Sequence, residues 1–218
     1  MIDTVLFDLD GTLLNTLEDL CDSTNYALKA FGYPERTLDE VRSFVGEGVR
    51  LLIERALPYS ATDKTGEVLA VFEEHYDRNK ENKTRPYDGI AEMLKAVCPK
   101  YKTAIVSNKY DKAVADLRDK LFPQVTLAVG ERSDLRKKPA PDMPKYAMSE
   151  LRSSEESTVY VGDSNIDILT ARNSGLPVIA VSWGFRPRKL LEELGADEII
   201  DNPSELLGAI EKLGSNRS

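Results

Sequence analysis

Residues Val5 to Thr16 read VLFDLDGTLLNT, a short apolar run followed by two aspartates and a glycine. The apolar run predicts a buried strand that ends where Asp8 begins the polar segment. In extended chain, residues i and i+2 point to the same side, so Asp8 and Asp10 can aim at one spot. Paired carboxylates repel each other unless a cation neutralises them or they perform acid-base chemistry. We interpret the pair as a candidate active site; the alternative is a pair of strand-end polar residues with Asp10-Gly11 as a turn.

Four further apolar, partly β-branched runs resemble this first strand, at 103–106, 125–129, 158–161 and 177–181. Helical patterns separate them. Runs bounded in this way are typical of parallel strands covered on both faces. The predicted fold class is therefore α/β, with a doubly wound parallel sheet as a Rossmann-like core.

Residues 17–83 show helical periodicity and no strand pattern, with helices expected at 17–31, 38–44, 48–57 and 65–79. An insertion of this length after the first strand of a parallel sheet is too long for a simple crossover helix. We therefore predict a second, smaller all-helical domain at 17–83 and a core domain formed by 1–16 and 84–218. Proline and glycine in 85–89 indicate the return linker.

The core helices are expected at 91–97, 111–121, 142–151, 166–173 and about 204–213. Asp111 and Ser204 are the expected N-caps of two of them, and Pro144 is expected in the first turn of a third. Gly175 is the expected stop after 173. The last residues, 214–218, are expected to fray.

Composition narrows the class of protein and its partners. The formal net charge is -8 with a sequence pI near 4.9, which disfavours nucleic acid or an anionic membrane as partner. No apolar run is long enough for a membrane span, and the N-terminus has no signal-peptide pattern, so a cytoplasmic location is expected. Cys21 and Cys98 lie far apart, which argues against a disulfide framework.

Polar residues follow several of the predicted strands: Ser107 and Asn108, Lys138 before Pro139, and Asp163 with Asp167. Each has an ordinary explanation when taken alone, as a cap, a turn, a solvated lysine pair or a helix-dipole partner. In a doubly wound sheet, however, the ligand crevice lies at the carboxyl ends of the strands. Their joint occurrence in this order predicts one functional site.

The segments DLDGTLLNT, VSNK, KKPAPD and GDSNID resemble, in order and spacing, the signature motifs of the haloacid dehalogenase superfamily of phosphotransferases. The resemblance covers essentially the whole chain. The helical insert is similar to the cap domain of the subgroup that contains phosphoglycolate phosphatases, pyrophosphatases and β-phosphoglucomutases. Within it, residues 44–57 resemble the glycine-containing loop and helix of phosphoglycolate phosphatases.

This resemblance implies catalytic roles for the two aspartates of the first motif. Asp8 is the expected nucleophile, which attacks phosphorus to give an aspartyl-phosphate. Asp10 is the expected general acid, which protonates the leaving alkoxide and then activates the hydrolytic water. Magnesium is the expected metal, bound by the Asp8 carboxylate, the Asp10 backbone carbonyl and Asp163, with Asp167 supporting the site.

The other motifs imply contacts to the phosphoryl group. Ser107 is expected to bond a phosphoryl oxygen, and Lys138 to neutralise charge on the nucleophile and the phosphoryl group, with Lys137 as the fallback. The backbone amides after Asp8 and Asn108 are further expected donors. Asn15 and Thr16 stand where this subgroup often has an acid followed by Ser or Thr, so the departure from the pattern is at Asn15.

Substrate choice is assigned to the cap, with Gly46, Glu47, Gly48 and Arg50 as candidate substrate-binding residues. The alternatives are a plain helix N-terminus for the glycines and a surface salt bridge for Arg50. His75, the one histidine, is interpreted as a surface residue, and Trp183 as a core residue.

The expected function is a Mg²⁺-dependent phosphomonoester hydrolase, phosphoglycolate phosphatase-like, which acts on a small phosphorylated metabolite. A monomer or homodimer is expected, with no nucleic acid or membrane partner. The alternatives are a pyrophosphatase, another sugar-phosphate phosphatase or a phosphomutase of the same superfamily. Outside this class stand a metal-independent dehalogenase and a catalytically silent regulatory or binding protein.

Overall fold

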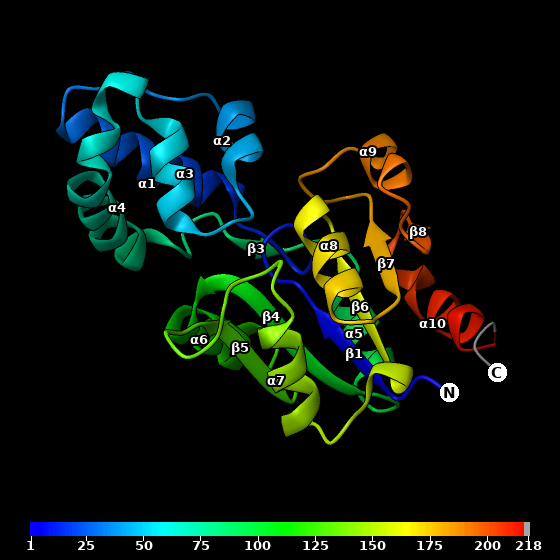
Figure 1. Cartoon of the computed structure of the whole chain (residues 1–218). Helices are drawn as coiled ribbons and strands as arrows, with labels where there is room; N and C mark the ends of the chain where they lie inside the picture. Colours follow the sequence, from blue (N-terminus) through cyan, green and yellow to red (C-terminus); the bar gives the residue numbers. More distant parts are fainter. Residues whose placement is uncertain (216–218) are drawn as a thin grey trace. The chain divides into compact units, whose positions relative to one another are not determined.

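The chain divides into two compact units (Figure 1). The computed structural model describes residues 1–215. Unit 1 comprises Met1–Leu13 and Pro86–Ser218, and unit 2 comprises Leu14–Arg85. The two short strands β2 (Leu14–Asn15) and β3 (Arg85–Pro86) pair with each other at the points where the chain passes from one unit to the other.

Unit 1 is built on a six-stranded sheet in the order β5-β4-β1-β6-β7-β8. Every neighbouring pair is parallel. The strands are β1 (Thr4–Phe7), β4 (Lys102–Tyr110), β5 (Leu127–Glu131), β6 (Thr158–Gly162), β7 (Val178–Val181) and β8 (Glu198–Ile200). The predicted α/β class and parallel sheet are confirmed.

The chain winds outward from β1 in both directions. On one side of β1, the helices α5 (Ile90–Val97) and α6 (Asp111–Leu121) precede the strands β4 and β5, respectively. The chain then returns to the other side of β1 through α7 (Asp142–Glu150), α8 (Asn165–Asn173) and α9 (Arg188–Glu193), before α10 (Leu206–Ser215) ends the unit. Because connections between parallel strands are right-handed, the reversal of strand order at β1 is expected to place the two sets of helices on opposite faces, as in a doubly wound sheet.

The central strand β1 explains why the first apolar run is continuous rather than alternating. All four of its residues are buried, because helices cover both faces of the sheet. Leu6 lies in register with Ala104 of β4 and Tyr160 of β6. These three residues share one core cluster with Met143 of α7 and Ile168 of α8.

Two predicted strands differ from the structure by more than one residue at an end, and several short elements were missed. The strand expected at 125–129 lies at Leu127–Glu131, and the strand expected at 103–106 continues to Tyr110. Ser107 and Asn108 therefore lie within β4 rather than after it, in a part where the pairing register with β5 shifts. The short α9 and β8 had no predicted counterpart, because neither carries a run long enough to show a period.

The predicted helix ends were only partly correct. Pro144 lies in the first turn of α7, and Gly175 follows α8 with a φ of 72°, as expected. Asp111 does not cap α6; it is the first residue of the helix, and its carboxylate accepts a hydrogen bond from the Gly130 amide at 2.8 Å. Ser204 is not a cap either, since the side chain of Asn202 accepts from the Ser204 amide.

The C-terminal helix, Leu206–Ser215, begins and ends about two residues later than predicted. Gly214 and Ser215, which were expected to fray, belong to α10, which packs its apolar side inward through Leu206, Ile210 and Leu213. The remaining residues of that prediction, 216–218, lie outside the described residues.

Between residues 17 and 83 the regular elements of unit 2 are helices, joined by turns and loops. Its helices are α1 (Leu17–Ala30), α2 (Leu38–Phe44), α3 (Val49–Ala56) and α4 (Thr65–Asn79), with a 3-10 turn at Tyr59–Lys64. Thr37 and Glu40 form a capping box that starts α2. Leu28, Ile53 and Phe72 are fully buried and give the unit its own core.

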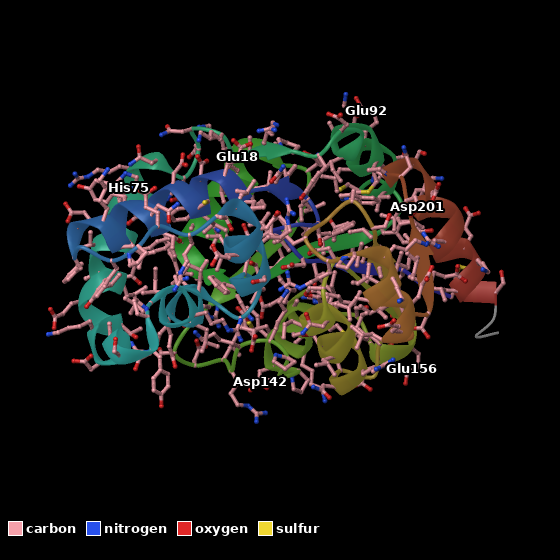
Figure 2. The ribbon with its side chains drawn as sticks, turned by 90° about the horizontal axis from the view of Figure 1, so that it is seen from above. Glu18, His75, Glu92, Asp142, Glu156 and Asp201 are labelled. Atoms are coloured by element: carbon pink, nitrogen blue, oxygen red, sulfur yellow. The ribbon has the colours of Figure 1, made fainter. Side chains whose placement is uncertain are left out.

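Other features bear on partners and environment. Both cysteines are free thiols. Among the described helices, none combines the length and apolar character needed to cross a membrane. Acidic side chains lie around the periphery of unit 1, where Figure 2 labels Glu92, Asp142, Glu156 and Asp201.

Because β1 lies at the centre of the sheet, shortening its core side chain is expected to destabilise unit 1. Leu6→Ala should lower the free energy of unfolding by about 2–5 kcal/mol in urea titrations, as buried leucine truncations do. Leu169→Ala, at a helix position that is 39% exposed, is the matched control and should change it by less than about 0.5 kcal/mol. Equal effects of the two substitutions would contradict this account of the core.

Candidate active site

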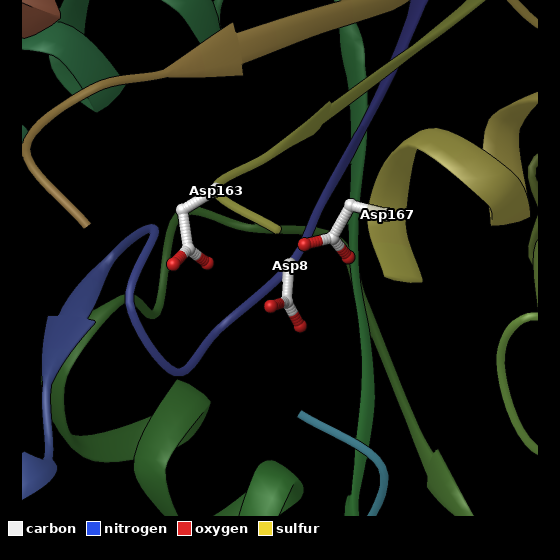
Figure 3. Close-up of side chains that lie close together, drawn as sticks. All are labelled: Asp8, Asp163 and Asp167. Carbon is white, nitrogen blue, oxygen red and sulfur yellow. The ribbon is translucent and has the colours of Figure 1, made fainter. Parts of the chain in front are cut away.

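Three buried carboxylates converge at the carboxyl end of the sheet (Figure 3). Asp8 follows β1, Asp163 follows β6, and Asp167 lies in the first turn of α8. A carboxylate oxygen of each lies within 4.8 Å of those of the other two. They meet because β1 and β6 are neighbours in parallel register, with Phe7 beside Val161, so both strands deliver their next residues to one edge.

The ammonium of Lys138 lies among these carboxylates. Its Nζ donates to Asp8 Oδ1 at 2.7 Å, to Asp167 Oδ1 at 2.8 Å and to the Tyr160 hydroxyl at 3.0 Å. An ammonium has three N–H donors, so all of them are used. Lys137, by contrast, pairs with Glu131 at 2.7 Å. Of the two adjacent lysines, Lys138 is the one that contacts the candidate nucleophile.

Asn108 holds the backbone of Lys138. Its Nδ2 donates to the Lys138 carbonyl at 3.0 Å, and its Oδ1 accepts from the Lys138 amide at 2.8 Å. The side chain predicted to bind substrate therefore orients the lysine loop. Ser107 is 2% exposed, and its Oγ accepts from the Lys109 amide at 3.2 Å, which leaves the hydroxyl proton available for another acceptor.

Asp163 is held by two loops. Its Oδ2 accepts from the Phe185 amide at 2.7 Å, and its Oδ1 accepts from the Thr12 hydroxyl at 3.3 Å. The chain passes so close to this carboxylate that a Cβ on Gly184 would lie 2.3 Å from the Asp163 Cβ, and one on Gly11 would lie 2.5 Å from its Oδ2. Glycine is therefore required at both positions.

Asp167 serves the helix and the site together. Its Oδ2 accepts from the amide and hydroxyl of Ser164, which is the N-cap of α8, while its Oδ1 faces Lys138. The cap interpretation of this motif and the functional one are therefore compatible. The capping box fixes the carboxylate that the lysine contacts.

Burial and mutual repulsion dominate the electrostatics of the site. Burial, followed by the charge of Asp167, raises the pKa of Asp8 well above its ordinary value and that of Asp163 to about 7. Burial by itself lowers the pKa of Lys138, but the carboxylates of Asp167 and Asp8 outweigh it and hold the lysine protonated. Three carboxylates thus face one ammonium, and the excess negative charge suits a divalent cation.

The donor set of this cluster fits a hard cation. All of the side-chain ligands that it offers are carboxylate oxygens, which Mg²⁺ prefers and which soft metals do not. Burial, followed by the charge of Asp167, raises the pKa of Asp8 and Asp163, so the metal-free cluster disfavours its own ionised form. The residues present therefore fit the predicted magnesium.

Asp10 does not join this cluster through its side chain. Its carboxylate is contacted instead by Lys109, whose Nζ lies 3.0 Å from Oδ1 and 3.1 Å from Oδ2. Lys109 is 5% exposed. The motif VSNK contains this lysine, for which no role was predicted. A lysine directly after Ser107-Asn108 at a predicted strand end was the available signal.

The candidate cap residues lie in unit 2, in the segment that leads into α3. Gly46 and Gly48 have φ angles of 125° and 92°, which favour glycine. Glu47 is paired with Arg55, which also donates to the Phe44 carbonyl. Arg50 is exposed and forms no ion pair with any described residue, so the salt bridge considered for it is absent from this part of the chain.

Two aromatic contacts bear on the sequence interpretation. His75, labelled in Figure 2, is half-buried: its Nδ1 lies 3.0 Å from the Ser23 Oγ, and its ring stacks on Tyr26 with centroids 4.0 Å apart. His75 is therefore partly exposed, with part of its ring covered by Tyr26. Trp183 is not a core residue, since it is half-buried and its indole donates to the Thr12 carbonyl at 3.0 Å.

Comparison with known proteins finds one family model and relatives whose names agree with that family. The model of a family described as haloacid dehalogenase-like hydrolase matches residues 5–181. A phosphoglycolate phosphatase of Agrobacterium fabrum is 33% identical, over 96% of this chain and 93% of its own length. A phosphoglycolate phosphatase of Aquifex aeolicus is 32% identical, over 93% of this chain and 94% of its own length. The crystal structure of a proposed phosphoglycolate phosphatase from Lactobacillus delbrueckii superposes with a TM-score of 0.89 at 36% identity, over 95% of this chain and 98% of that one.

The raised pKa of Asp163 predicts a pH-dependent stability for the metal-free protein. The folded pKa of about 7 exceeds the unfolded value of 3.8, so the folded protein binds a proton that the unfolded chain releases. Stability should therefore fall as the pH rises from about 4 to 7, by up to about 1.4 kcal/mol per pH unit.

Urea unfolding at pH 5 and pH 8, in chelator, measures this loss. Wild type should lose more stability between the two pH values than Asp163→Asn does. Adding a divalent cation at pH 8 should restore stability to wild type and less to the variant. Parallel profiles for the two proteins would contradict the assignment.

Proposed function

This chain belongs to the haloacid dehalogenase-like hydrolase family, and we propose that it is a phosphoric monoester hydrolase acting on a small phosphometabolite through an aspartyl-phosphate on Asp8. The observation that carries the proposal is the contact between Lys138 and Asp8, among carboxylates that suit a cation. A carboxylate held in this way is placed to attack the electrophilic phosphorus atom of a phosphate ester.

In the first step, a carboxylate oxygen of Asp8 forms a bond to phosphorus while the bond from phosphorus to the ester oxygen breaks. Asp10 gives its proton to the departing oxygen. In the second step, Asp10 takes a proton from a water molecule, which attacks the aspartyl-phosphate and releases phosphate and free Asp8. Lys138 keeps the Asp8 carboxylate in place throughout, through a hydrogen bond of 2.7 Å.

Ser107 and the metal contribute to binding of the phosphoryl group. The Ser107 hydroxyl, which retains a free proton, donates to a phosphoryl oxygen. Magnesium would be held by the carboxylates of Asp8 and Asp163 and by the Asp10 backbone carbonyl, with Asp167 as support. When bound, it supplies positive charge that offsets the negative charge of the phosphoryl group.

The proposed substrate is a phosphate ester like that of phosphoglycolate phosphatases, with selection by the predicted cap domain, 17–83. The names of the relatives and the likeness of residues 44–57 to a phosphoglycolate phosphatase loop support this assignment. Arg50 is exposed and forms no ion pair with any described residue, so its guanidinium is available to an anionic substituent. Gly46, Glu47 and Gly48 stay proposed substrate-binding residues on the same loop.

The nucleophile assignment is tested by phosphate release from 4-nitrophenyl phosphate with Mg²⁺. Wild type should be active, and Asp8→Asn should lose activity by at least about a thousandfold, because the variant lacks the attacking carboxylate. Chelator should abolish wild-type turnover, and Mg²⁺ should restore it.

The control for this test is Asp116→Asn, at an exposed position of α6, which should match wild type. A wild type that is inactive on every phosphate ester would favour a silent binding protein. Activity that survives complete removal of metal would favour a metal-independent enzyme instead.

The role of Arg50 is tested by comparing a carboxylate-bearing ester, 2-phosphoglycolate, with 4-nitrophenyl phosphate, whose aryl group carries no charge. Arg50→Met should lower kcat/KM for phosphoglycolate by about tenfold or more, as expected for a lost charge-assisted hydrogen bond. It should leave turnover of the aryl ester within about twofold, since that substrate has no anionic tail for Arg50. Equal effects on both substrates would remove Arg50 from substrate selection.

A further inference from the structure

Lys109 and Asp10 form a second ion pair, separate from that of Lys138 and Asp8. The Lys109 ammonium contacts both oxygens of the Asp10 carboxylate, at 3.0 and 3.1 Å. The Lys109 side chain is 3% exposed and that of Asp10 is 15% exposed. A lysine that is almost fully buried requires a charged partner, because an unpaired buried ammonium is strongly destabilising.

From this contact we infer that Lys109 is a positioning residue that holds the Asp10 carboxyl in the orientation needed for proton transfer at the leaving-group oxygen. The inference rests on the proposed function, in which Asp10 is the general acid and base. Contact with both oxygens fixes the plane of the carboxyl group as well as its place. A carboxyl that turns freely would spend little time aligned with the departing oxygen.

The sheet explains why these two residues meet. Strands β1 and β4 are parallel neighbours, with Phe7 beside Ile105, so the residues that follow Phe7 and Ile105 in the chain reach the same edge of the sheet. The Ser107 hydroxyl accepts from the Lys109 amide at 3.2 Å and so fixes the backbone from which the lysine extends. Lys109 therefore reaches Asp10 from the strand that also carries Ser107.

Lys138 cannot perform this task. Its three N–H groups already donate to Asp8, Asp167 and Tyr160. The two aspartates of the DLD motif are thus held by different ammonium groups on different segments. This separation allows the attacking carboxylate and the proton-transferring carboxylate to be oriented independently.

A purely structural ion pair and a positioning pair predict different dependence on the leaving group. An acidic phenol leaves without help from a proton donor, whereas an alcohol needs protonation as its bond to phosphorus breaks. Misplacing Asp10 should therefore slow alkyl phosphates far more than nitrophenyl phosphates. Damage to folding or to metal binding would slow both classes equally.

The experiment measures kcat/KM for Lys109→Met on 4-nitrophenyl phosphate, phenyl phosphate and an alkyl phosphate, each with saturating Mg²⁺. The variant should lose roughly tenfold or more on the alkyl ester beyond its loss on the nitrophenyl ester, a part of the ~100-fold or greater effect of general acid catalysis. Lys109→Arg, which keeps a cation able to grip both oxygens, should recover part of this difference. Lys112→Met, at an exposed position of α6, should match wild type on all three.

Equal losses of Lys109→Met across the three esters would overturn the inference and leave the proposed function intact. An inactive wild type would overturn the proposed function itself, so the two failures are distinguishable. Urea unfolding and calorimetric Mg²⁺ titration establish that each variant is folded and binds metal. If Lys109→Met does not fold, Lys109→Gln and Lys109→Arg carry the same leaving-group comparison, with a larger alkyl-specific loss expected for Gln.

Discussion

The buried ammonium of Lys138 joins four segments of unit 1. It donates to Asp8 after β1, to Tyr160 of β6 and to Asp167 of α8, while Asn108 of β4 holds its backbone. Burying a lysine is costly unless each of its donors has a partner. Here every donor is satisfied, so the same contacts that make the lysine tolerable also set the position of the candidate nucleophile.

This network leaves an imbalance of charge that has functional meaning. One ammonium faces three carboxylates, and burial with repulsion raises the pKa of Asp8 and Asp163. Such an arrangement opposes the stability of the empty site and favours binding of a cation. The apolar sheet below it, with β1 fully buried, provides the stability that permits the imbalance.

Much of the fold follows from local pattern. Buried parallel strands show as continuous apolar runs, and the helices of unit 2 show a clear helical period, so the α/β class and the helical insert were predictable. The short α9 and β8 were not, because too few residues carry their pattern. Asp111 and Ser204 were misassigned as caps for a different reason, since their neighbours Gly130 and Asn202 provide the competing hydrogen bonds.

The sequence predicts which residue types form the candidate site and where they lie relative to the strands. They are two aspartates after the first apolar run, a lysine before Pro139 and the acids of GDSNID. Chain order carried that information because parallel strands deliver their carboxyl ends to one edge. Which ammonium holds which carboxylate was settled only in three dimensions. Lys138 is 130 residues from Asp8 and Lys109 is 99 residues from Asp10. Local sequence patterns carry no information about contacts between residues so far apart in the chain. The register of the sheet and the length of the side chains decide these contacts. They make Lys138 the partner of Asp8 and Lys109 the partner of Asp10.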